Sequence, residues 1–268
     1  MSQITIDKAR IGTSSPHFSL VDFRTMYERV HRDFAIWEII VEGDHHPEKI
    51  SGPARELLAS DPMDLQVHVP IGDVNIGSIS DRMRDAAVEE VIGALKFAAE
   101  VGADPVTVHP GHFSPTSRGN TELLNKRMMD SIRKIGKAAE DLGIVAGLEN
   151  MPNFPFAHIK HPGELLETIE GTGLFITFDI GHASTCDNLA GFLYPGIVDL
   201  VKNVHIHDNF GKMDDHVALG NGNIDLPMVV RELEGLGFTG SYIIETKNFE
   251  DSMRGLEYMG HIGDIQGC

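Results

Sequence analysis

Residues 204–208 read Val-His-Ile-His-Asp, and the chain continues through Asp-Asp-His at 214–216 to Leu-Gly-Asn-Gly at 219–222. Val204 and Ile206 alternate with two histidines, a pattern typical of a buried strand that has one polar face. The loop after this strand carries a second set of aspartate and histidine side chains. Because burying so many polar groups without partners is costly, the stretch indicates that they bind a metal ion.

Short apolar runs alternate with helical patterns along the whole chain on both sides of this stretch. Strands are expected at 9–14, 34–41, 64–70, 105–109, 144–149, 175–179, 203–207 and 242–245. Helices are expected at 19–32, 47–59, 81–101, 121–142, 161–170, 188–201, 226–236 and 249–259. The pattern at 188–201 is broken by Pro195 and Gly196.

Eight strands that alternate with eight helices predict a (β/α)₈ TIM barrel of the α/β class. Because no linker or change of composition divides the chain, we expect a single domain over residues 1–268. A doubly wound sheet is the alternative. Residues 12–16, Gly-Thr-Ser-Ser-Pro, lack the glycine-rich phosphate turn that usually follows the first strand of that fold.

The composition limits which binding partners and which cellular compartment are expected. The 268 residues include 40 acidic and 22 basic side chains, a net charge of −18 that repels nucleic acid in the absence of a basic strip. The sequence lacks a long apolar run, and residues 1–8 lack the basic region of a signal peptide. We therefore expect neither a membrane span nor a secretion signal. Two isolated cysteines, Cys186 and Cys268, do not make a disulfide framework, so we expect a cytoplasmic protein.

Six ligand-type side chains occupy equivalent positions, at or just before the carboxyl ends of the third to eighth expected strands: His68, His109, Glu149, Asp179, His205 and Glu245. In a barrel these ends converge on one mouth, where active sites are built. Each residue taken alone could be a hydrogen-bonded rim residue or a structural carboxylate. Six such burials at equivalent positions are better explained by one metal site.

Two further groups combine carboxylate and imidazole. Residues 179–182, Asp-Ile-Gly-His, place the two types three apart across an expected strand-to-loop turn, where Gly181 would permit the bend. Residues 214–216, Asp-Asp-His, add another such pair. Mixed ligands of this kind suit Zn²⁺, Mn²⁺ or Co²⁺ rather than Ca²⁺, and the absence of cysteine ligands favours a site with open positions for substrate.

An ordered set of motifs over residues 67–245 resembles the xylose isomerase-like barrel superfamily, which includes endonuclease IV and sugar isomerases and epimerases. The motifs are Val67-His68-Val69-Pro70, Val108-His109-Pro110-Gly111, Gly147-Leu148-Glu149-Asn150, Phe178-Asp179-Ile180-Gly181-His182-Ala183, His205-Ile206-His207-Asp208-Asn209, Asp214-Asp215-His216 with Leu219-Gly220-Asn221-Gly222, and Ile244-Glu245.

The resemblance implies up to three metal sites. The metal common to the superfamily would be held by Glu149, Asp179, His205 and Glu245. A second site, as in the nuclease branch, would use His68, His109 and Glu149, and a third would use His182, Asp214 and His216. His205 is preferred over His207 because the family pattern places a carboxylate three residues after its ligand, where Asp208 stands; His207 remains the alternative.

Three features depart from the nuclease branch. The stretch between His205 and Asp214 is short and lacks the basic, serine-rich character of the nuclease loop. Ile180 and Gly181 follow Asp179 where the nuclease signature has threonine and cysteine, and residues 37–46 are acidic.

The resulting prediction is an isomerase or epimerase of a small sugar, sugar phosphate or keto acid that uses one to three divalent metal ions, Zn²⁺ or Mn²⁺, per chain. One of Glu149 and Glu245 would remove the proton next to a carbonyl and the other would return it, through a metal-stabilised enediolate. His182 would orient a hydroxyl. A homo-oligomer is compatible with the sequence.

Two alternatives stay open. The first is an endonuclease IV-like phosphoester hydrolase with a two- or three-zinc centre and a hydroxide bound near Glu149, and only this function would make DNA a partner. The second is a metal-binding or interaction protein without catalytic activity, since a fold does not determine a function.

Overall fold

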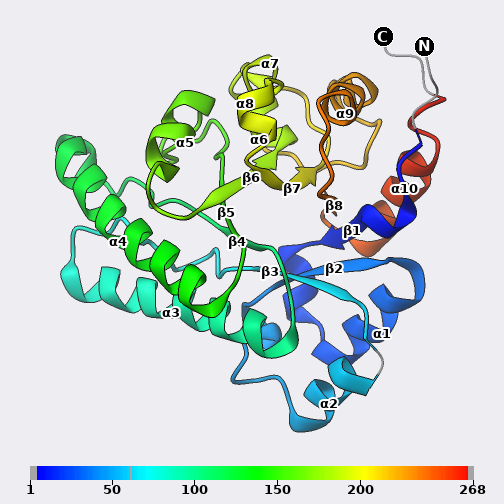
Figure 1. Cartoon of the computed structure of the whole chain (residues 1–268), viewed down its shortest axis with the longest axis horizontal. Helices are drawn as coiled ribbons and strands as arrows, with labels where there is room; N and C mark the ends of the chain where they lie inside the picture. Colours follow the sequence, from blue (N-terminus) through cyan, green and yellow to red (C-terminus); the bar gives the residue numbers. More distant parts are fainter. Residues whose placement is uncertain (1–4, 61, 265–268) are drawn as a thin grey trace.

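The eight strands each pair in parallel with their sequence neighbours, and β1 pairs with β8 to close the barrel (Figure 1). The strands are β1 (Ile11–Ser14), β2 (Ile36–Ile40), β3 (Asp64–His68), β4 (Val106–Val108), β5 (Ala146–Glu149), β6 (Phe175–Asp179), β7 (Val201–Ile206) and β8 (Ser241–Glu245). The structure is a computed structural model that describes residues 5–60 and 62–264. The predicted (β/α)₈ barrel is confirmed, and the doubly wound alternative is wrong because the sheet closes.

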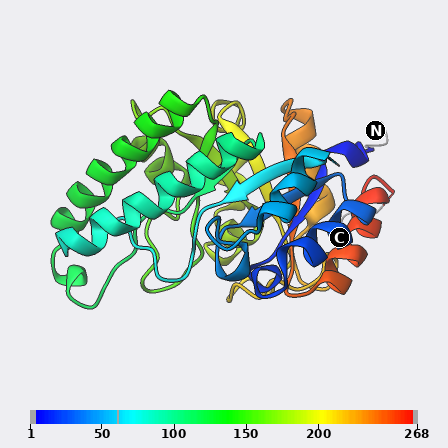
Figure 2. The ribbon, with the colours of Figure 1, turned by 90° about the horizontal axis from the view of Figure 1, so that it is seen from below.

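Helices surround the barrel. They are α1 (Phe23–Asp33), α2 (Gly52–Ser60), α3 (Asp81–Val101), α4 (Thr121–Leu142), α5 (Pro162–Ile169), α6 (Ile180–Thr185), α7 (Leu189–Phe192), α8 (Pro195–Val198), α9 (Leu226–Gly235) and α10 (Phe249–Gly260). The 3₁₀ turns are η1 (Lys8–Arg10), η2 (Pro16–Leu20), η3 (Gly43–His45) and η4 (Ser117–Gly119). The long helices α3 and α4 run side by side along one flank (Figure 2). Each ends at a glycine in the left-handed conformation, Gly102 or Gly143.

One expected helix is divided. The expected helix at 188–201 consists of the two short helices α7 and α8, separated at Leu193 and Tyr194. Pro195 cannot continue a helix because it lacks a backbone N–H, but it suits the first position of a new one, where it lies in α8.

The turn expected after strand β6 is wrong, because residues 180–185 form helix α6. Asp179 caps this helix by accepting a hydrogen bond from the backbone N–H of His182 at 2.6 Å. Gly181 therefore has a helical backbone and does not serve a bend. Its lack of a side chain makes room for an imidazole instead, since a Cβ at this position would lie 2.0 Å from Cε1 of His207.

The barrel interior below the mouth is polar. Glu38, Thr107, Thr177 and Asn203 are fully buried there, on strands β2, β4, β6 and β7. The Asn203 amide donates to Oε2 of Glu38 at 2.6 Å, and the Thr107 and Thr177 hydroxyls lie 3.2 Å apart. Because this hydrogen-bonded layer is tied to four strands, it forms a fixed floor beneath the strand ends.

The apolar core lies between the strands and the helices, where side chains such as Val67, Leu148 and Ile176 are fully buried. Among the described residues, no helix is long and apolar enough to cross a membrane. Cys186 is a half-buried free thiol, and Cys268 lies outside the described residues, as do residues 1–4.

Candidate metal centre

Three groups of histidine and carboxylate side chains meet at the carboxyl end of the barrel. We name them the central cluster (Glu149, Asp179, His205 and Glu245), the second cluster (His68, His109 and Glu149) and the third cluster (His182, His207, Asp214 and His216). Within each cluster, one ligand atom from every residue lies within 4.8 Å of the others. The structure thus brings together all nine side chains expected as ligands and adds His207 to the third cluster; that they bind ions stays a prediction.

The strands position most of these side chains. Glu149, Asp179 and Glu245 are the last residues of β5, β6 and β8, and His68 is the last residue of β3. His205 lies on β7 in register with Asp179, and His109 follows β4 directly. Parallel strands end at the same rim, so these side chains converge without any long loop.

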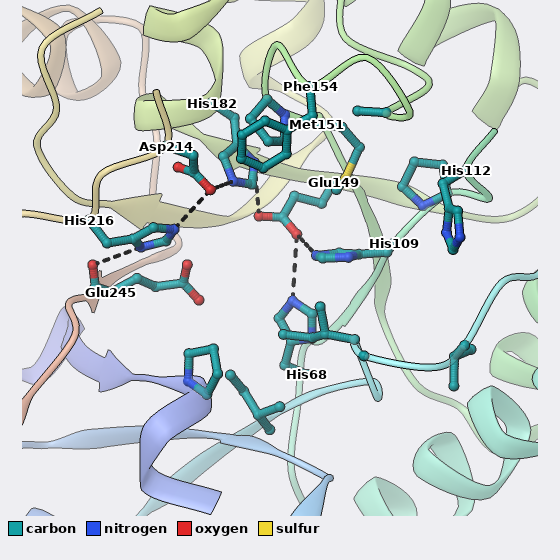
Figure 3. A pocket seen from close by; sticks show the side chains of 18 of the residues that line it. His68, His109, His112, Glu149, Met151, Phe154, His182, Asp214, His216 and Glu245 are labelled. Atoms are coloured by element: carbon teal, nitrogen blue, oxygen red, sulfur yellow. Dashed lines mark hydrogen bonds and ion pairs between the residues drawn. The ribbon is translucent and has the colours of Figure 1, made fainter. Parts of the chain in front are cut away.

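Glu149 joins the central and second clusters. Its Oε1 lies 2.9 Å from Nδ1 of His205, and its Oε2 lies 2.6 Å from Nε2 of His109 and 3.5 Å from Nε2 of His68. Oε1 of Glu245 lies 3.5 Å from the same nitrogen of His205. The carboxylates of Glu149 and Glu245 therefore face a common space, as Figure 3 shows.

Backbone carbonyls fix the tautomers of three histidines. Nδ1 of His68 donates to the carbonyl of Val69 at 2.7 Å, and Nδ1 of His182 donates to that of Asn150 at 2.8 Å. Nδ1 of His216 donates to the carbonyl of Glu245 at 3.2 Å. Because a carbonyl only accepts, each Nδ1 carries the proton, and the Nε2 lone pair is directed at a cluster, as in metal-ligating histidines.

Neighbouring charges shift the pKa values of Glu149 and His205 in the central cluster. Burial opposes ionisation of Glu149, but the charges of His205 and His109 outweigh it and hold the pKa of this carboxyl well below its usual value. Burial likewise opposes protonation of His205, yet Glu245, Glu38 and Glu149 raise its pKa well above the usual value. The Glu149 carboxylate thus remains charged and attracts a cation, whether a proton or a metal ion.

Unpaired buried atoms provide a test of whether a metal fits. Among the described residues, the buried side-chain atoms without a hydrogen bond include Asp179 Oδ2, Asp214 Oδ1 and both ring nitrogens of His207. Native structures rarely leave such atoms unsatisfied, because each one costs free energy. These atoms belong to the clusters, whereas other buried atoms without a hydrogen bond, on Ser14, Gln66 and Asn188, do not. The donor set of the clusters fits divalent metal ions of the kind that imidazole and carboxylate bind.

Sequence reasoning missed Glu38. This side chain is fully buried on β2, and its Oε1 lies 3.0 Å from Nε2 of His205, the nitrogen that points away from Glu149. A carboxylate behind a ligating imidazole orients the ring and raises its basicity. Glu38 is a lone glutamate within the apolar run at 34–41, and this pattern could have indicated a buried functional carboxylate.

Asp208 organises the loop that carries Asp214 and His216. Its two carboxylate oxygens accept hydrogen bonds from backbone N–H groups of Asn209, Gly220, Gly222 and Ile224. A Cβ at Gly222 would lie 2.2 Å from Oδ1 of Asp208. The motif at 219–222 therefore binds the Asp208 carboxylate through its backbone N–H groups. Asp208 itself lies outside the three clusters.

The mouth opens into a cavity of about 460 Å³, a size typical of small-molecule sites. Glu149, Glu245 and His182 line it. Apolar side chains line it as well: Ile71, Val74, Met151, Phe154 and Phe156. The cavity therefore offers both charged groups for chemistry and an apolar wall.

Known proteins share this architecture. The model of the family described as xylose isomerase-like TIM barrel matches residues 31–260. An uncharacterized protein of Methanocaldococcus jannaschii is 36% identical over 259 residues, which cover 93% of this chain and 88% of that protein. A 2-oxo-tetronate isomerase of Haemophilus influenzae is 24% identical over 221 residues, which cover 77% of this chain and 83% of that enzyme.

A solved structure described as a D-tagatose 3-epimerase-like protein superposes with a TM-score of 0.87 and 32% identity, covering 95% of this chain and 97% of that chain. The match of the family model to most of the chain agrees with the closed barrel and with the order of the motifs at its rim. The chain belongs to the xylose isomerase-like TIM barrel family.

Proposed function

We propose that this protein is a divalent-metal-dependent isomerase or epimerase of a small sugar, sugar phosphate or keto acid. The observation that carries the proposal is that Glu149 and Glu245 both face Nδ1 of His205, at 2.9 and 3.5 Å, and both line the cavity. Two carboxylates around one small space can serve as acid and base on a single carbon atom.

The named relatives support the substrate class. One is a 2-oxo-tetronate isomerase, and a similar solved structure is described as D-tagatose 3-epimerase-like. Both names denote rearrangement next to a carbonyl, the chemistry that needs a proton removed from one carbon and returned. The proposal extends this class to the present chain.

The two carboxylates would divide the proton transfers. Glu149 is held by His205 and His109 and stays ionised in the folded protein. The Glu245 carboxylate lies farther from Nδ1 of His205, at 3.5 Å, and would approach the substrate from another side of the cavity. One carboxylate would take the proton from the carbon next to the carbonyl, and the other would return it. Return to the opposite face inverts that carbon.

A metal ion, when bound, would be held by the central cluster and would polarise the carbonyl and stabilise negative charge on its oxygen. Glu38 would keep His205 oriented towards that position, through the 3.0 Å approach of Oε1 to Nε2. His182, expected to orient a hydroxyl, lies on the cavity wall with Nε2 3.4 Å from Asp214.

The test is exchange of hydrogen with solvent. The full chain, loaded with Mn²⁺ or Zn²⁺, would be incubated in D₂O with ketohexoses, L-ribulose and 2-oxo acids and followed by NMR. We expect deuterium at the carbon next to the carbonyl of at least one compound, and no exchange with Glu149→Gln or Glu245→Gln. The exposed glutamate variant Glu257→Gln is the matched control. Absence of exchange with every compound would contradict the proposal.

A hydrolase is the second candidate, because Glu149 bridges two adjacent clusters, as carboxylates do in two-metal phosphoesterases. The net charge of −18 opposes duplex DNA as the substrate. Nicking of an abasic-site duplex, or release of nitrophenol from a nitrophenyl phosphodiester, would favour this function over the isomerase.

A further inference from the structure

His112, in the loop after β4, lies on the cavity wall and is held there through its backbone. The side-chain amide of Asn75, in the loop after β3, donates to the carbonyl of His112 at 3.1 Å and accepts from its N–H at 3.0 Å. The N–H of the next residue, Phe113, donates to the carbonyl of Phe156 in the loop after β5 at 2.8 Å. The two neighbouring loops thus fix the backbone from which the His112 side chain enters the cavity.

The imidazole of His112 is available to bind a ligand. Within the described chain, the hydrogen bonds of His112 are made by its backbone, and neither ring nitrogen has a partner. Burial, and after it the charge of His109, lower the pKa of His112 below its ordinary value, so the ring is neutral near pH 7. A neutral imidazole offers one N–H donor and one acceptor. A hydroxyl group, which also donates and accepts, matches this pair.

An aromatic surface adjoins this imidazole. The rings of Phe154 and Phe156 stack with their centroids 5.4 Å apart, and the His112 ring lies at 77° to that of Phe156 with centroids 6.2 Å apart. Phe156 lines the cavity and is 48% exposed. Because the C–H groups of a sugar chain are apolar, their burial against this ring would be favourable. A hydrogen-bonding group beside an apolar surface suits a polyol chain.

This side of the cavity has no lysine or arginine that would bind a phosphate. Among the described residues that line the cavity, Lys247 is the one lysine, and arginine is absent. Lys247 follows β8, which lies opposite β4 in the closed barrel. A phosphate group beside His112 would therefore lose water without gaining a lysine or arginine partner.

The usual phosphate position of this fold carries negative charge in this chain. Barrels of eight β/α units frequently bind phosphate at the loops after strands 7 and 8. In the loop after β7, the carboxylate of Asp208 already accepts the N–H of Gly222. Helix α10, after β8, is capped by the side chain of Asn248 and has Glu250 and Asp251 in its first turn. A phosphate would be repelled at both loops.

We propose that His112 and Phe156 form a subsite for the end of the substrate remote from the central cluster, and that this end carries an uncharged hydroxyl group. The substrate is then an unphosphorylated sugar rather than a sugar phosphate. Figure 3 shows His112 beyond His109, on the side away from Glu245, so a substrate that reacts beside Glu149 would extend past His109 to reach the subsite. The assignment rests on the proposed function and specifies its substrate class.

The test measures binding of polyols, which have no carbonyl and therefore cannot be isomerised. The full chain, loaded with Zn²⁺, would be titrated by calorimetry with D-glucitol, with the shorter erythritol and with D-glucitol 6-phosphate. We expect wild type to bind D-glucitol about 3–10-fold more tightly than erythritol, the effect of one or two hydrogen bonds. In His112→Phe this preference should be lost, whereas the exposed-histidine control His261→Phe should keep it.

Two further measurements separate hydrogen bonding from packing and from charge. His112→Gln, which restores a neutral donor and acceptor, should recover part of the preference for D-glucitol over erythritol. The affinity for D-glucitol 6-phosphate should be the same in wild type and His112→Phe, because its phosphate would not enter the subsite. Circular dichroism and metal analysis would verify that each variant folds and carries the same amount of Zn²⁺.

An unchanged preference for D-glucitol in His112→Phe would overturn the proposal, as would a wild type that binds both polyols equally or binds neither. A larger loss of affinity for D-glucitol 6-phosphate than for D-glucitol in His112→Phe would overturn it too, because the subsite would then take phosphate. None of these readouts depends on turnover. Failure of the proposed isomerase activity is therefore distinguishable from failure of this assignment.

Discussion

The central cluster and the third cluster use the same residue types on different supports. The ligands of the central cluster, Glu149, Asp179, His205 and Glu245, lie on four parallel strands, above a buried polar floor. In the third cluster, Asp214 and His216 come from a loop, which Asp208 holds through four backbone hydrogen bonds. Strands thus position ligands by their register alone, whereas a loop needs a second set of residues to do so.

The largest effect should come from Glu149→Gln, because Glu149 belongs to two clusters. We expect the metal bound by the central and second clusters to be lost and solvent exchange into a ketose to fall by about 10²–10⁴-fold. The third cluster should keep its ion, which metal analysis would show. Simultaneous loss of the ion from the third cluster would mean that the clusters are not independent.

The second-largest effect should be a lower thermal stability of the protein after all metal is removed. An ion present at 100 times its Kd contributes about 2.7 kcal/mol, which corresponds to about 5–10 °C in Tm for a chain of this size. The variant Asp214→Asn should show a smaller metal-dependent shift than wild type, because only the other two clusters remain. Calorimetry with and without chelator would measure both shifts, and equal Tm values for metal-loaded and metal-free wild type would contradict the expectation.

A smaller effect, confined to the central cluster, is expected from Glu38→Gln. Loss of a carboxylate behind a ligating histidine typically weakens metal affinity by about 10–100-fold. Competition with a chromophoric chelator would measure the affinity, with the exposed Glu28→Gln as control. Unchanged affinity would show that the 3.0 Å approach of Glu38 to His205 has no influence on the site.

The smallest effect should come from Gly222→Ala, which acts on the loop of the third cluster through Asp208. The added Cβ would meet Oδ1 of Asp208 at 2.2 Å, so the loop must shift, at a cost of about 1–3 kcal/mol. We expect faster metal release from the third cluster only. Gly119→Ala, whose Cβ would lie in open space, is the control, and identical release rates in the two variants would count against the role of Asp208.

The same contrast explains what could be predicted from the sequence. Strand ends such as Glu149 and Glu245 were identifiable because alternation of residues and closure of the barrel determine where they lie. The expected strand positions are confirmed, with boundaries shifted by a few residues at most in most cases.

Other features depend on contacts between distant residues. Glu38 was missed because its role arises from its approach to His205, across the barrel interior. The requirement for Gly181 was misassigned to a bend because nothing local reveals that His207 lies against it. The short helix α6 was missed because its cap, Asp179, was interpreted only as a ligand.

The central claim is that side chains from separate strands converge to hold one ion between Glu149 and Glu245. Anomalous diffraction from crystals of the protein grown with Mn²⁺ or Zn²⁺ tests it most directly. The account predicts a peak about 2.0–2.2 Å from donor atoms of Glu149, Asp179, His205 and Glu245. A metal-loaded crystal with no peak among these four side chains would contradict it.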